Sequence, residues 1–314
     1  MGTSYSIKAA TNQLDLKYKV DSLLNSFNSI FSTYDTLSLI SKINGSIEDS
    51  VCIRDNDSLF LNTLNLAKYV WNNTNGYFDP TVMPLVKYWG FGPHPTLLTK
   101  VNQYDIDSIL TRIGLDKLIW KWQDGQLCFV KNQQKLLIDL NAIAKGKGVD
   151  VIAAYFNQLH IKDYMIEIGG EVRVKGKNNE DQYWKIGIDK PINTKNLADR
   201  QNQAIIQLKD EAIASSGNYR NFHEVDGKIV GHTINPISGY AEINDLLGVS
   251  VIAEGCAIAD AYATGFMAMG YEKAYAVASK IEGIKVLFIK LGGDGESIEL
   301  VGTNNFESNI VTQN

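Results

Sequence analysis

Residues 249–270 read VSVIAEGCAIADAYATGFMAMG, and this stretch decides how the fold is interpreted. Apolar and β-branched residues predict a strand over Gly248 to Ala253. Small residues then predict a helix from about Ala257 to Met269, and Gly270 is typical of a residue that ends a helix. So many alanines and glycines would let other backbone come close to this helix.

The same helix carries the first candidate for chemistry. Asp260 and Thr264 are four residues apart, so their side chains lie on one face of the helix, one turn apart. A carboxylate and a hydroxyl placed in this way can both direct oxygens at one Mg²⁺ ion, which prefers oxygen ligands. The alternative is structural, with Asp260 bonded to a neighbouring turn and Thr264 to its own helix. On spacing alone the structural alternative is the more frequent one.

Outward from this stretch, strands and helices alternate without regular βαβ units. Thr3 to Ala9 is predicted as a strand, and apolar residues at helical spacing predict a long amphipathic helix from Leu16 to Phe31. Two strands are expected within Lys117 to Leu140, joined by a hairpin turn at Asp124-Gly125. The class is therefore α+β, with mainly antiparallel sheets and packed helices. We expect one domain over residues 1–314, with two intertwined subdomains as the alternative.

The net charge of the chain limits the classes of molecule that it is expected to bind. The 314 residues carry a formal net charge of −5, and the isoelectric point is near 5.5. Such a balance gives no long-range attraction to nucleic acid, and none is expected as a partner. Any bound anion must be held by local groups, such as backbone amides, a few cations or a metal.

The three cysteines, Cys52, Cys128 and Cys256, form no CxxC pair and are odd in number. We expect three buried thiols and neither a disulfide framework nor a zinc site. No apolar run approaches the roughly 18 residues of a membrane span, and no secretory signal is visible. Composition leaves open whether the protein is cytoplasmic or lost an export segment.

A second candidate is DLNAIAKGKG, from Asp139 to Gly148. The expectation is a strand end, a turn of small residues over 141–148, and then a helix. Exposed N–H groups at a helix start, beside Lys145 and Lys147, would form an anion site. The segment lacks the spacing of a phosphate-binding P-loop. An ordinary capped helix with solvated lysines is an equally good interpretation.

Three more segments hold candidate residues. His232, in the strand-and-turn GHTINPISG of 231–239, could act as a general base or bond a phosphate, although a lone histidine is more often structural. Residues 215–220, SSGNYR, suit contact with phosphate or ribose, or are a glycine bulge with a surface arginine. The aromatic residues of 76–92 could clamp a planar ring or simply belong to the core. A hard-metal site, an anion cradle, a base and an aromatic platform together fit chemistry on a nucleotide diphosphate.

In order along nearly the whole chain, the sequence resembles the ApbE-like FAD:protein FMN transferases. Nine segments in register carry the resemblance: MGTSYSI, FSTYDTLSLISKIN, GYFDPTVMPLVKYWGFG, IDLNAIAKGKGVD, YMIEIGGEVRVKG, WKIGIDKP, AIASSGNYRNF, HTINPISGY and VSVIAEGCAIADAYATGFMAMG. The resemblance implies the ApbE-like fold. It also implies transfer of FMN from the substrate FAD to a threonine hydroxyl of another protein, with Mg²⁺ as cofactor and AMP as product.

The resemblance also implies roles for matching positions. Asp260 and Thr264 would bind Mg²⁺ through their side chains, with the Ala144 carbonyl as a third ligand. His232 would lie beside the FAD diphosphate, so His232 and Asp260 are the expected catalytic residues. Met1 would touch the flavin or adenine pocket. The remaining expected cofactor-binding residues are Asp79, Thr81, Lys145, Glu171, Ser216 and Gly217.

Two positions depart from the family pattern. Leu39 stands where the first polar motif of the family usually has an acidic residue, and Asn235 stands where the histidine turn usually has an aspartate. Asn235 could orient His232 but could not take a proton. Two alternatives therefore stay open: an Mg²⁺-dependent FAD diphosphatase that gives FMN and AMP, and a flavin-binding protein without catalysis.

The resemblance further implies where the protein works and on what. The acceptor would be a flavoprotein subunit of a membrane redox pump. Members of the family are usually exported and often lipid-anchored, so the expected location is the extracytoplasmic face of the cytoplasmic membrane, as a periplasmic lipoprotein.

Overall fold

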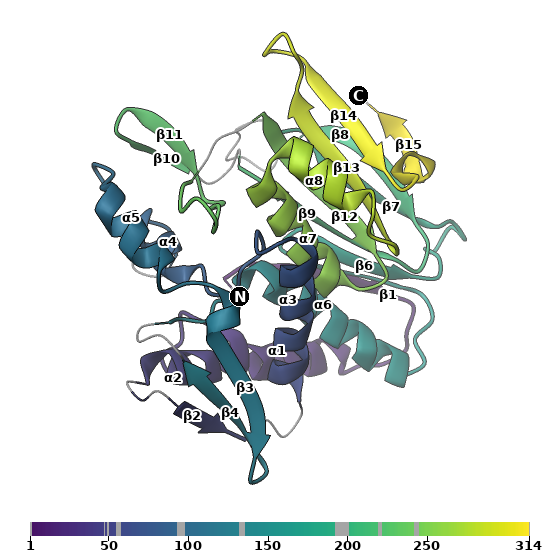
Figure 1. The fold of residues 1–314 in the computed structure, drawn as a ribbon. Helices are drawn as coiled ribbons and strands as arrows, with labels where there is room; N and C mark the ends of the chain where they lie inside the picture. The colour runs from purple at the N-terminus through teal and green to yellow at the C-terminus, as the bar shows by residue number, and fades with distance from the viewer. Residues whose placement is uncertain are drawn as a thin grey trace.

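The computed structural model describes residues 2–46, 48, 50–54, 58–92, 98–131, 136–191, 201–218, 222–241 and 245–313. Within these ranges helices pack on β-sheets (Figure 1), and every strand pair is antiparallel. The predicted α+β class is therefore confirmed.

A seven-stranded sheet forms the centre of the molecule, in the order β1-β5-β6-β9-β12-β13-β14. Its strands are β1 (Tyr5–Ala9), β5 (Tyr164–Ile168), β6 (Glu171–Lys175), β9 (Ala212–Gly217), β12 (Leu246–Ala253), β13 (Ile284–Leu291) and β14 (Ile298–Thr303). The N-terminal strand thus pairs with a strand more than 150 residues later, at one edge of the sheet. The predicted strands at the start of the chain and before the small-residue helix are both present.

Three smaller sheets complete the β-structure among the described residues. They are β2 (Ser50–Ile53) with β4 (Gln126–Lys131) and β3 (Leu118–Gln123); β15 (Ile310–Gln313) with β8 (Asn202–Leu208) and β7 (Trp184–Asp189); and β10 (Phe222–Val225) with β11 (Lys228–Gly231). Asp124 and Gly125, between β3 and β4, have φ of 51° and 72°. Two consecutive positive φ values are those of a type I′ turn, so the predicted hairpin is confirmed.

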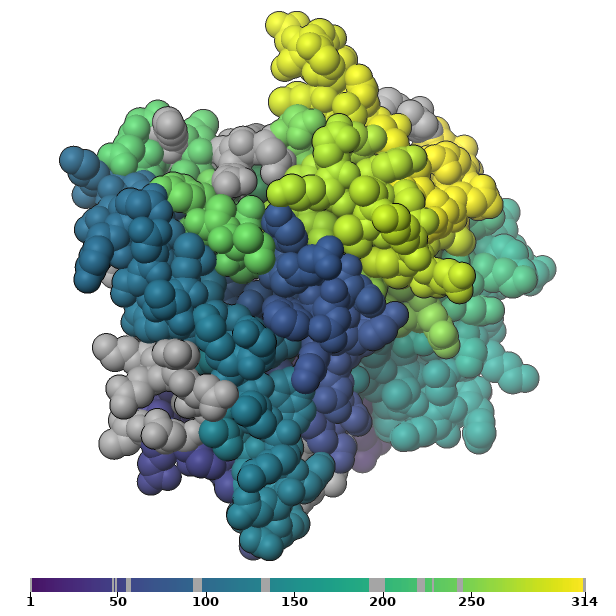
Figure 2. All heavy atoms as spheres, in the orientation of Figure 1, coloured from purple at the N-terminus to yellow at the C-terminus, as the bar shows by residue number. Residues whose placement is uncertain are grey.

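The helices are α1 (Leu16–Phe31), α2 (Leu39–Gly45), α3 (Leu59–Asn73), α4 (Met83–Tyr88), α5 (Gln103–Leu110), α6 (Asn141–Gln158), α7 (Cys256–Met269) and α8 (Tyr271–Ala278), with 3₁₀ turns at Leu115–Lys117 and Phe306–Asn309. Helix α7 packs on β9 and β12 of the central sheet and touches both α3 and α6. In the space-filling view the blue surface of α3 lies directly against the yellow-green C-terminal segment (Figure 2). None of the helices in the described ranges is long and apolar enough to cross a lipid bilayer.

The predicted turn over 141–148 is wrong, because these residues form the first two turns of α6. The reason is the contact that α6 makes with α7. A Cβ atom added to Gly146 would lie 2.3 Å from the carbonyl oxygen of Cys256 and 2.8 Å from the Cα atom of Ala257. Glycines that look like turn formers in the sequence instead allow two helices to touch through their backbones.

A carboxylate of α6 also caps the start of α7. The N–H groups of Cys256 and Ala257 donate to the two Asp150 carboxylate oxygens, each at 2.9 Å. Arg173 of β6 donates to the same carboxylate at 2.5 Å. The first N–H groups of a helix have no partner inside the helix, so a carboxylate here satisfies two of them and interacts favourably with the helix dipole. Asp150 therefore fixes the end of α7 from which Asp260 projects one turn later.

The prediction of three free thiols is wrong for two of them. Cys52 and Cys128 face each other across β2 and β4 and form a disulfide, with Cα atoms 4.0 Å apart. They are 76 residues apart in sequence, so only the pairing of the two strands reveals the bond. Cys256 is buried and free, as predicted.

We predict that Gly146→Ala lowers the free energy of unfolding by about 1–3 kcal/mol, because an added methyl group overpacks a rigid backbone contact. Denaturant unfolding followed by circular dichroism measures this. Gly45→Ala is the matched control, since Gly45 ends α2 with no atom within 4 Å of the added Cβ. Equal stability of the two variants would show that the α6–α7 contact is not as tight as described.

Candidate active site

A cleft of about 1030 Å³ lies between the central sheet, helices α6 and α7, and the segment that leads into α4. Its size is that of a site for a large cofactor or nucleotide. Eight of the predicted site residues form part of its wall: Asp79, Ala144, Lys145, Ser216, Gly217, His232, Asp260 and Thr264. Residues more than 180 positions apart in sequence thus meet at one cavity.

Three other predicted residues are placed differently. Thr81 is fully buried behind Asp79, and its hydroxyl donates to an Asp79 carboxylate oxygen at 2.6 Å and accepts the Gly114 N–H at 2.7 Å. Glu171 is buried behind Lys145. Met1 lies outside the described residues. The structure therefore gives Thr81 and Glu171 positions that support other cleft residues.

Asp260 is a buried carboxylate in the cleft wall. Its Oδ2 accepts the backbone N–H of Gly146 at 3.0 Å, and its Oδ1 lies 3.7 Å from the Lys145 ammonium nitrogen. Burial raises the pKa of Asp260 above its ordinary value, although Lys145 and the Gly146 N–H oppose the shift. One oxygen is thus fixed by backbone and the other faces a cation at more than hydrogen-bond distance.

Lys145 donates instead to Oε1 of Glu171, the first residue of β6. Burial disfavours the ammonium ion, but the charges of Asp260 and Glu171 outweigh burial and raise the pKa of Lys145. Burial, together with the charge of Asp260, raises the pKa of Glu171 to about 8, although Lys145 lowers it. One cation therefore lies near two buried acids, and burial raises the pKa of both acids.

The wall around Asp260 has the chemistry of a hard-cation site. Asp260, Thr264 and Ala144 all line the same cavity, so a carboxylate, a hydroxyl and a backbone carbonyl belong to residues of one wall. No group of three or more His, Cys, Asp or Glu side chains in the described ranges could hold a metal. An ion here would therefore take one carboxylate with hydroxyl, carbonyl and water oxygens, which is the ligand type that Mg²⁺ accepts. The residues fit that ion.

The predicted anion cradle at the start of α6 is not formed as expected. Oδ1 of Asp139 accepts the N–H of Asn141 at 2.8 Å, so a carboxylate already occupies the helix start. Burial raises the pKa of Asp139, which also lines the cleft and for which we predicted no separate role. Lys147 is half-buried, and burial lowers its pKa. Of the two lysines, Lys145 lines the cleft.

His232 lies in the cleft wall just after β11, with its ring 6.4 Å from that of Phe91. Asn235 shapes the turn that follows: its Oδ1 accepts the N–H groups of Ile237 at 2.9 Å and Ser238 at 3.2 Å. An aspartate would form the same turn, so the family's usual residue and Asn235 are equivalent in this role. This departure therefore leaves His232 in place.

The departure at Leu39 also has a structural account. Leu39 begins α2 and packs against the largest hydrophobic cluster, and the preceding Ser38 caps the helix by accepting the N–H of Ser41 at 3.1 Å. The polar motif thus forms the start of a helix.

The cleft is also lined by aromatic side chains, those of Tyr34, Tyr77, Phe78 and Phe91. Trp89, from the aromatic segment 76–92, is instead buried in the core. Tyr34 was the one of these that the sequence did not single out.

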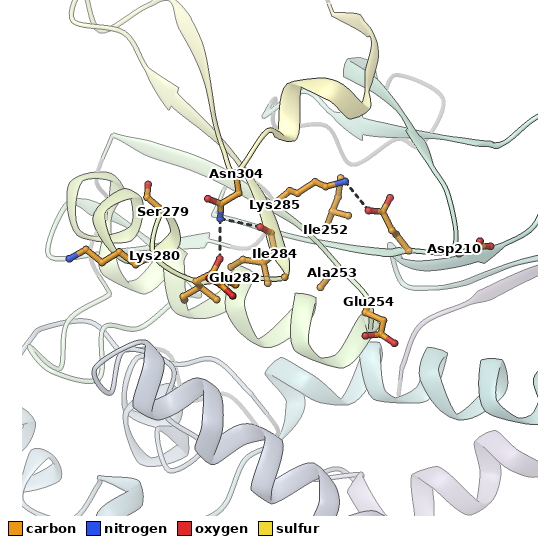
Figure 3. Close-up of a pocket in the computed structure, with 13 residues that line it drawn as sticks. Asp210, Ile252, Ala253, Glu254, Ser279, Lys280, Glu282, Ile284, Lys285 and Asn304 are labelled. Atoms are coloured by element: carbon orange, nitrogen blue, oxygen red, sulfur yellow. Dashed lines mark hydrogen bonds and ion pairs between the residues drawn. The ribbon is translucent and has the colours of Figure 1, made fainter.

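A second cavity of about 670 Å³ lies near β12, β13 and the end of α8 (Figure 3). None of the predicted site residues that the structure describes lines it. Two of its polar side chains are hydrogen-bonded within the protein: Lys285 donates to Glu211 at 2.8 Å, and the Asn304 amide donates to three backbone carbonyls, those of residues 278, 281 and 284. These contacts close the connection between α8 and β13, which is a structural role.

Comparison with known proteins gives one consistent answer. The family model described as "ApbE family" matches residues 1–288. The FAD:protein FMN transferase of Vibrio cholerae is 36% identical over 300 residues, 94% of this chain and 86% of that protein. The Escherichia coli K12 protein of the same name is 32% identical over 285 residues, covering 91% and 79%.

Solved structures agree. The flavin transferase ApbE from Vibrio cholerae superposes with a TM-score of 0.84 at 34% identity, covering 98% of this chain and 96% of that one. The apo flavinyl transferase ApbE from Pseudomonas stutzeri gives 0.84 at 27% identity, covering 100% and 95%. The fold is therefore that of a flavin transferase. The chain belongs to the ApbE family.

We predict that raising the pH costs the wild type more stability than Glu171→Gln. A carboxyl whose pKa is about 8 when folded and near 4.5 when unfolded holds a proton that the unfolded chain has lost. The wild type should therefore lose unfolding free energy relative to the variant as pH rises from about 4.5 to 8, and the difference should level off above 8. Denaturant unfolding with chelator across this range measures it. A pH-independent difference would show that Glu171 ionises normally.

Proposed function

We propose that this protein is an Mg²⁺-dependent FAD:protein FMN transferase that moves FMN from FAD to a threonine hydroxyl of an acceptor flavoprotein and releases AMP. The transferase activity follows from the relatives of that name. The observation that supports the metal dependence is the shared wall in which Asp260, Thr264, Ala144 and Lys145 face one large cleft. Binding of flavin without catalysis would not require a hard-cation site in that wall.

In the reaction, the threonine oxygen attacks the phosphorus on the riboflavin side of the diphosphate. A new P–O bond forms as the bond to the AMP oxygen breaks, and the hydroxyl proton passes to a base. Transfer of this kind depends on positioning and charge neutralisation more than on covalent help from the enzyme. Bound at Asp260, Thr264 and the Ala144 carbonyl, Mg²⁺ would neutralise diphosphate charge and stabilise the leaving AMP.

The chain's own residues supply the rest. His232 is the side chain that we assign as proton acceptor, because it lines the same cleft as Asp260, Thr264 and Lys145. Lys145 adds positive charge beside the diphosphate. The Ser216-Gly217 end of β9 provides short side chains and open backbone for phosphate or ribose contact. The cleft aromatics provide an apolar surface for the flavin ring.

Hydrolysis of FAD would use the same site, with water in place of the acceptor hydroxyl. Incubation with FAD and Mg²⁺, with and without a threonine-bearing acceptor, separates the two reactions. Transfer predicts an acceptor whose mass increases by one FMN residue. Free FMN at the same rate with or without acceptor would favour the diphosphatase.

The acceptor that we propose is a flavoprotein subunit of a membrane redox pump, and the proposed location is the extracytoplasmic face of the cytoplasmic membrane, as a lipoprotein. The disulfide between Cys52 and Cys128 supports an oxidising compartment. Cytosolic thiols are kept reduced, so structural disulfides occur mainly in proteins outside the cytoplasm.

We predict that Asp260→Asn lowers transfer at least about 100-fold, since loss of a group in a metal's outer shell alone costs about 10–100-fold. The amide can still accept the Gly146 N–H, so the fold should survive. Acceptor mass and circular dichroism measure the two effects. Full transfer by a metal-saturated variant would contradict the assignment of Asp260.

We predict that His232→Ala slows transfer by about 10²–10⁴-fold, the usual contribution of a general base. FAD affinity, measured by fluorescence quenching, should change little. An unchanged transfer rate would remove His232 from the mechanism, and an equal loss of FAD affinity would make it a binding residue.

We predict that the denatured, unreduced protein from an oxidising compartment exposes one reactive thiol, that of Cys256, and three after reduction. Thiol titration measures this. Three thiols before reduction would contradict both the disulfide and the location that it supports.

A further inference from the structure

The position of Lys145 beside the proposed metal site raises a physical problem. Its neighbour Ala144 would supply a ligand, and its ammonium nitrogen lies 3.7 Å from Oδ1 of Asp260. If the ammonium moved within hydrogen-bond distance, it would neutralise the one carboxylate that the site has. A lysine and a divalent cation therefore compete for the same oxygen.

Glu171 lies where it can prevent this. The Glu171 side chain is 2% exposed, whereas the Lys145 side chain is 34% exposed. Oε1 of Glu171 accepts a hydrogen bond from the Lys145 ammonium group. Its other oxygen, Oε2, is buried with no hydrogen-bond partner. A buried acid with an orphaned oxygen costs stability, so a structural role alone does not account for it.

The backbone around Glu171 is shaped for this contact. Gly169 and Gly170 form the turn before β6, with φ of 61° and 103°. A Cβ atom on Gly169 would lie 3.4 Å from Cδ of Lys145, so the lysine stem runs close to this turn. The turn and β6 thus present the Glu171 carboxyl to the ammonium group, which is bonded to Glu171 and stays 3.7 Å from Oδ1 of Asp260.

We propose that Glu171 is a positioning residue that holds the Lys145 ammonium off Asp260 and so keeps Oδ1 of Asp260 available to a divalent cation. This inference rests on the proposed metal-dependent function. The action is hydrogen-bond acceptance and does not require a charge on Glu171. A glutamine should therefore replace Glu171, and an apolar side chain of similar size should not.

The test is the affinity for Mn²⁺, followed by electron paramagnetic resonance without nucleotide, with Mg²⁺ as competitor. In Glu171→Leu the ammonium loses its acceptor and turns to Asp260, and the Mn²⁺ dissociation constant should rise about 10–100-fold, as is usual when the partner of a metal-site residue is removed. In Glu171→Gln it should stay within about threefold of the wild type. Circular dichroism checks the fold of each variant.

A second substitution separates this account from simple loss of charge. Lys145→Met removes the competing cation, so the double variant with Glu171→Leu should regain an affinity within about threefold of the wild type, a direct measure of coupling between the two residues. Lys145→Met alone should bind Mn²⁺ as tightly as the wild type or more tightly. Glu167→Gln is the matched charge control, because Glu167 also lines the cleft but accepts the Gly170 N–H at 2.7 Å.

Several outcomes would overturn the proposal. They are an unchanged Mn²⁺ affinity in Glu171→Leu, an equal loss of Mn²⁺ affinity in Glu171→Gln, or a loss in Glu171→Leu that persists when Lys145→Met is added. A tenfold loss in Lys145→Met alone would also overturn it, even if Glu171→Leu did not fold. Failure of the proposed function is distinguishable, because then the wild type itself would bind no Mn²⁺ at this site and Asp260→Asn would change nothing.

Discussion

The site depends on one contact, the backbone-to-backbone packing of α6 on the start of α7. Gly146 removes the side chain that would keep the helices apart, and its N–H fixes one oxygen of Asp260. Asp150, one turn further along α6, caps α7 through two N–H groups. These contacts give Ala144, Lys145 and Asp260 their relative positions, although more than a hundred residues separate Asp260 from the other two in sequence. Helices held at side-chain distance could not bring Ala144 of one and Asp260 of the other to the wall of the same cleft.

That packing also explains the unusual electrostatics of the cleft. The close approach buries Asp260, Glu171 and the Lys145 ammonium together, and burial opposes the charge of each group. A protein without a ligand for this site would gain stability by replacing the three with apolar residues. Retaining two acids around one lysine is consistent with a site whose charge is completed by a bound cation and an anionic substrate. The orphaned oxygen of Glu171 belongs to the same arrangement.

Local patterns predicted much of the fold. The spacing of apolar residues predicted α1, the run of small residues predicted α7, and the Asp-Gly pair predicted the β3–β4 turn. Each of these patterns is local, because it lies within a few residues of the chain. The failures all involve distant partners. The Cys52–Cys128 bond depends on strand pairing, and the helical state of 141–148 depends on contact with α7. The spacing of one helical turn suggested that Asp260 and Thr264 act as a pair. Only the structure shows that Thr81 donates a hydrogen bond to Asp79 and that Glu171 accepts one from Lys145.

The central claim is that Asp260, Thr264 and the Ala144 carbonyl hold a hard cation against the diphosphate of FAD. A crystal structure with FAD and Mn²⁺, with the ion located by anomalous scattering, tests it most directly. We expect one anomalous peak within coordination distance of all three groups and of a pyrophosphate oxygen. A well-ordered FAD whose pyrophosphate lies away from α7, with no ion between them, would contradict it.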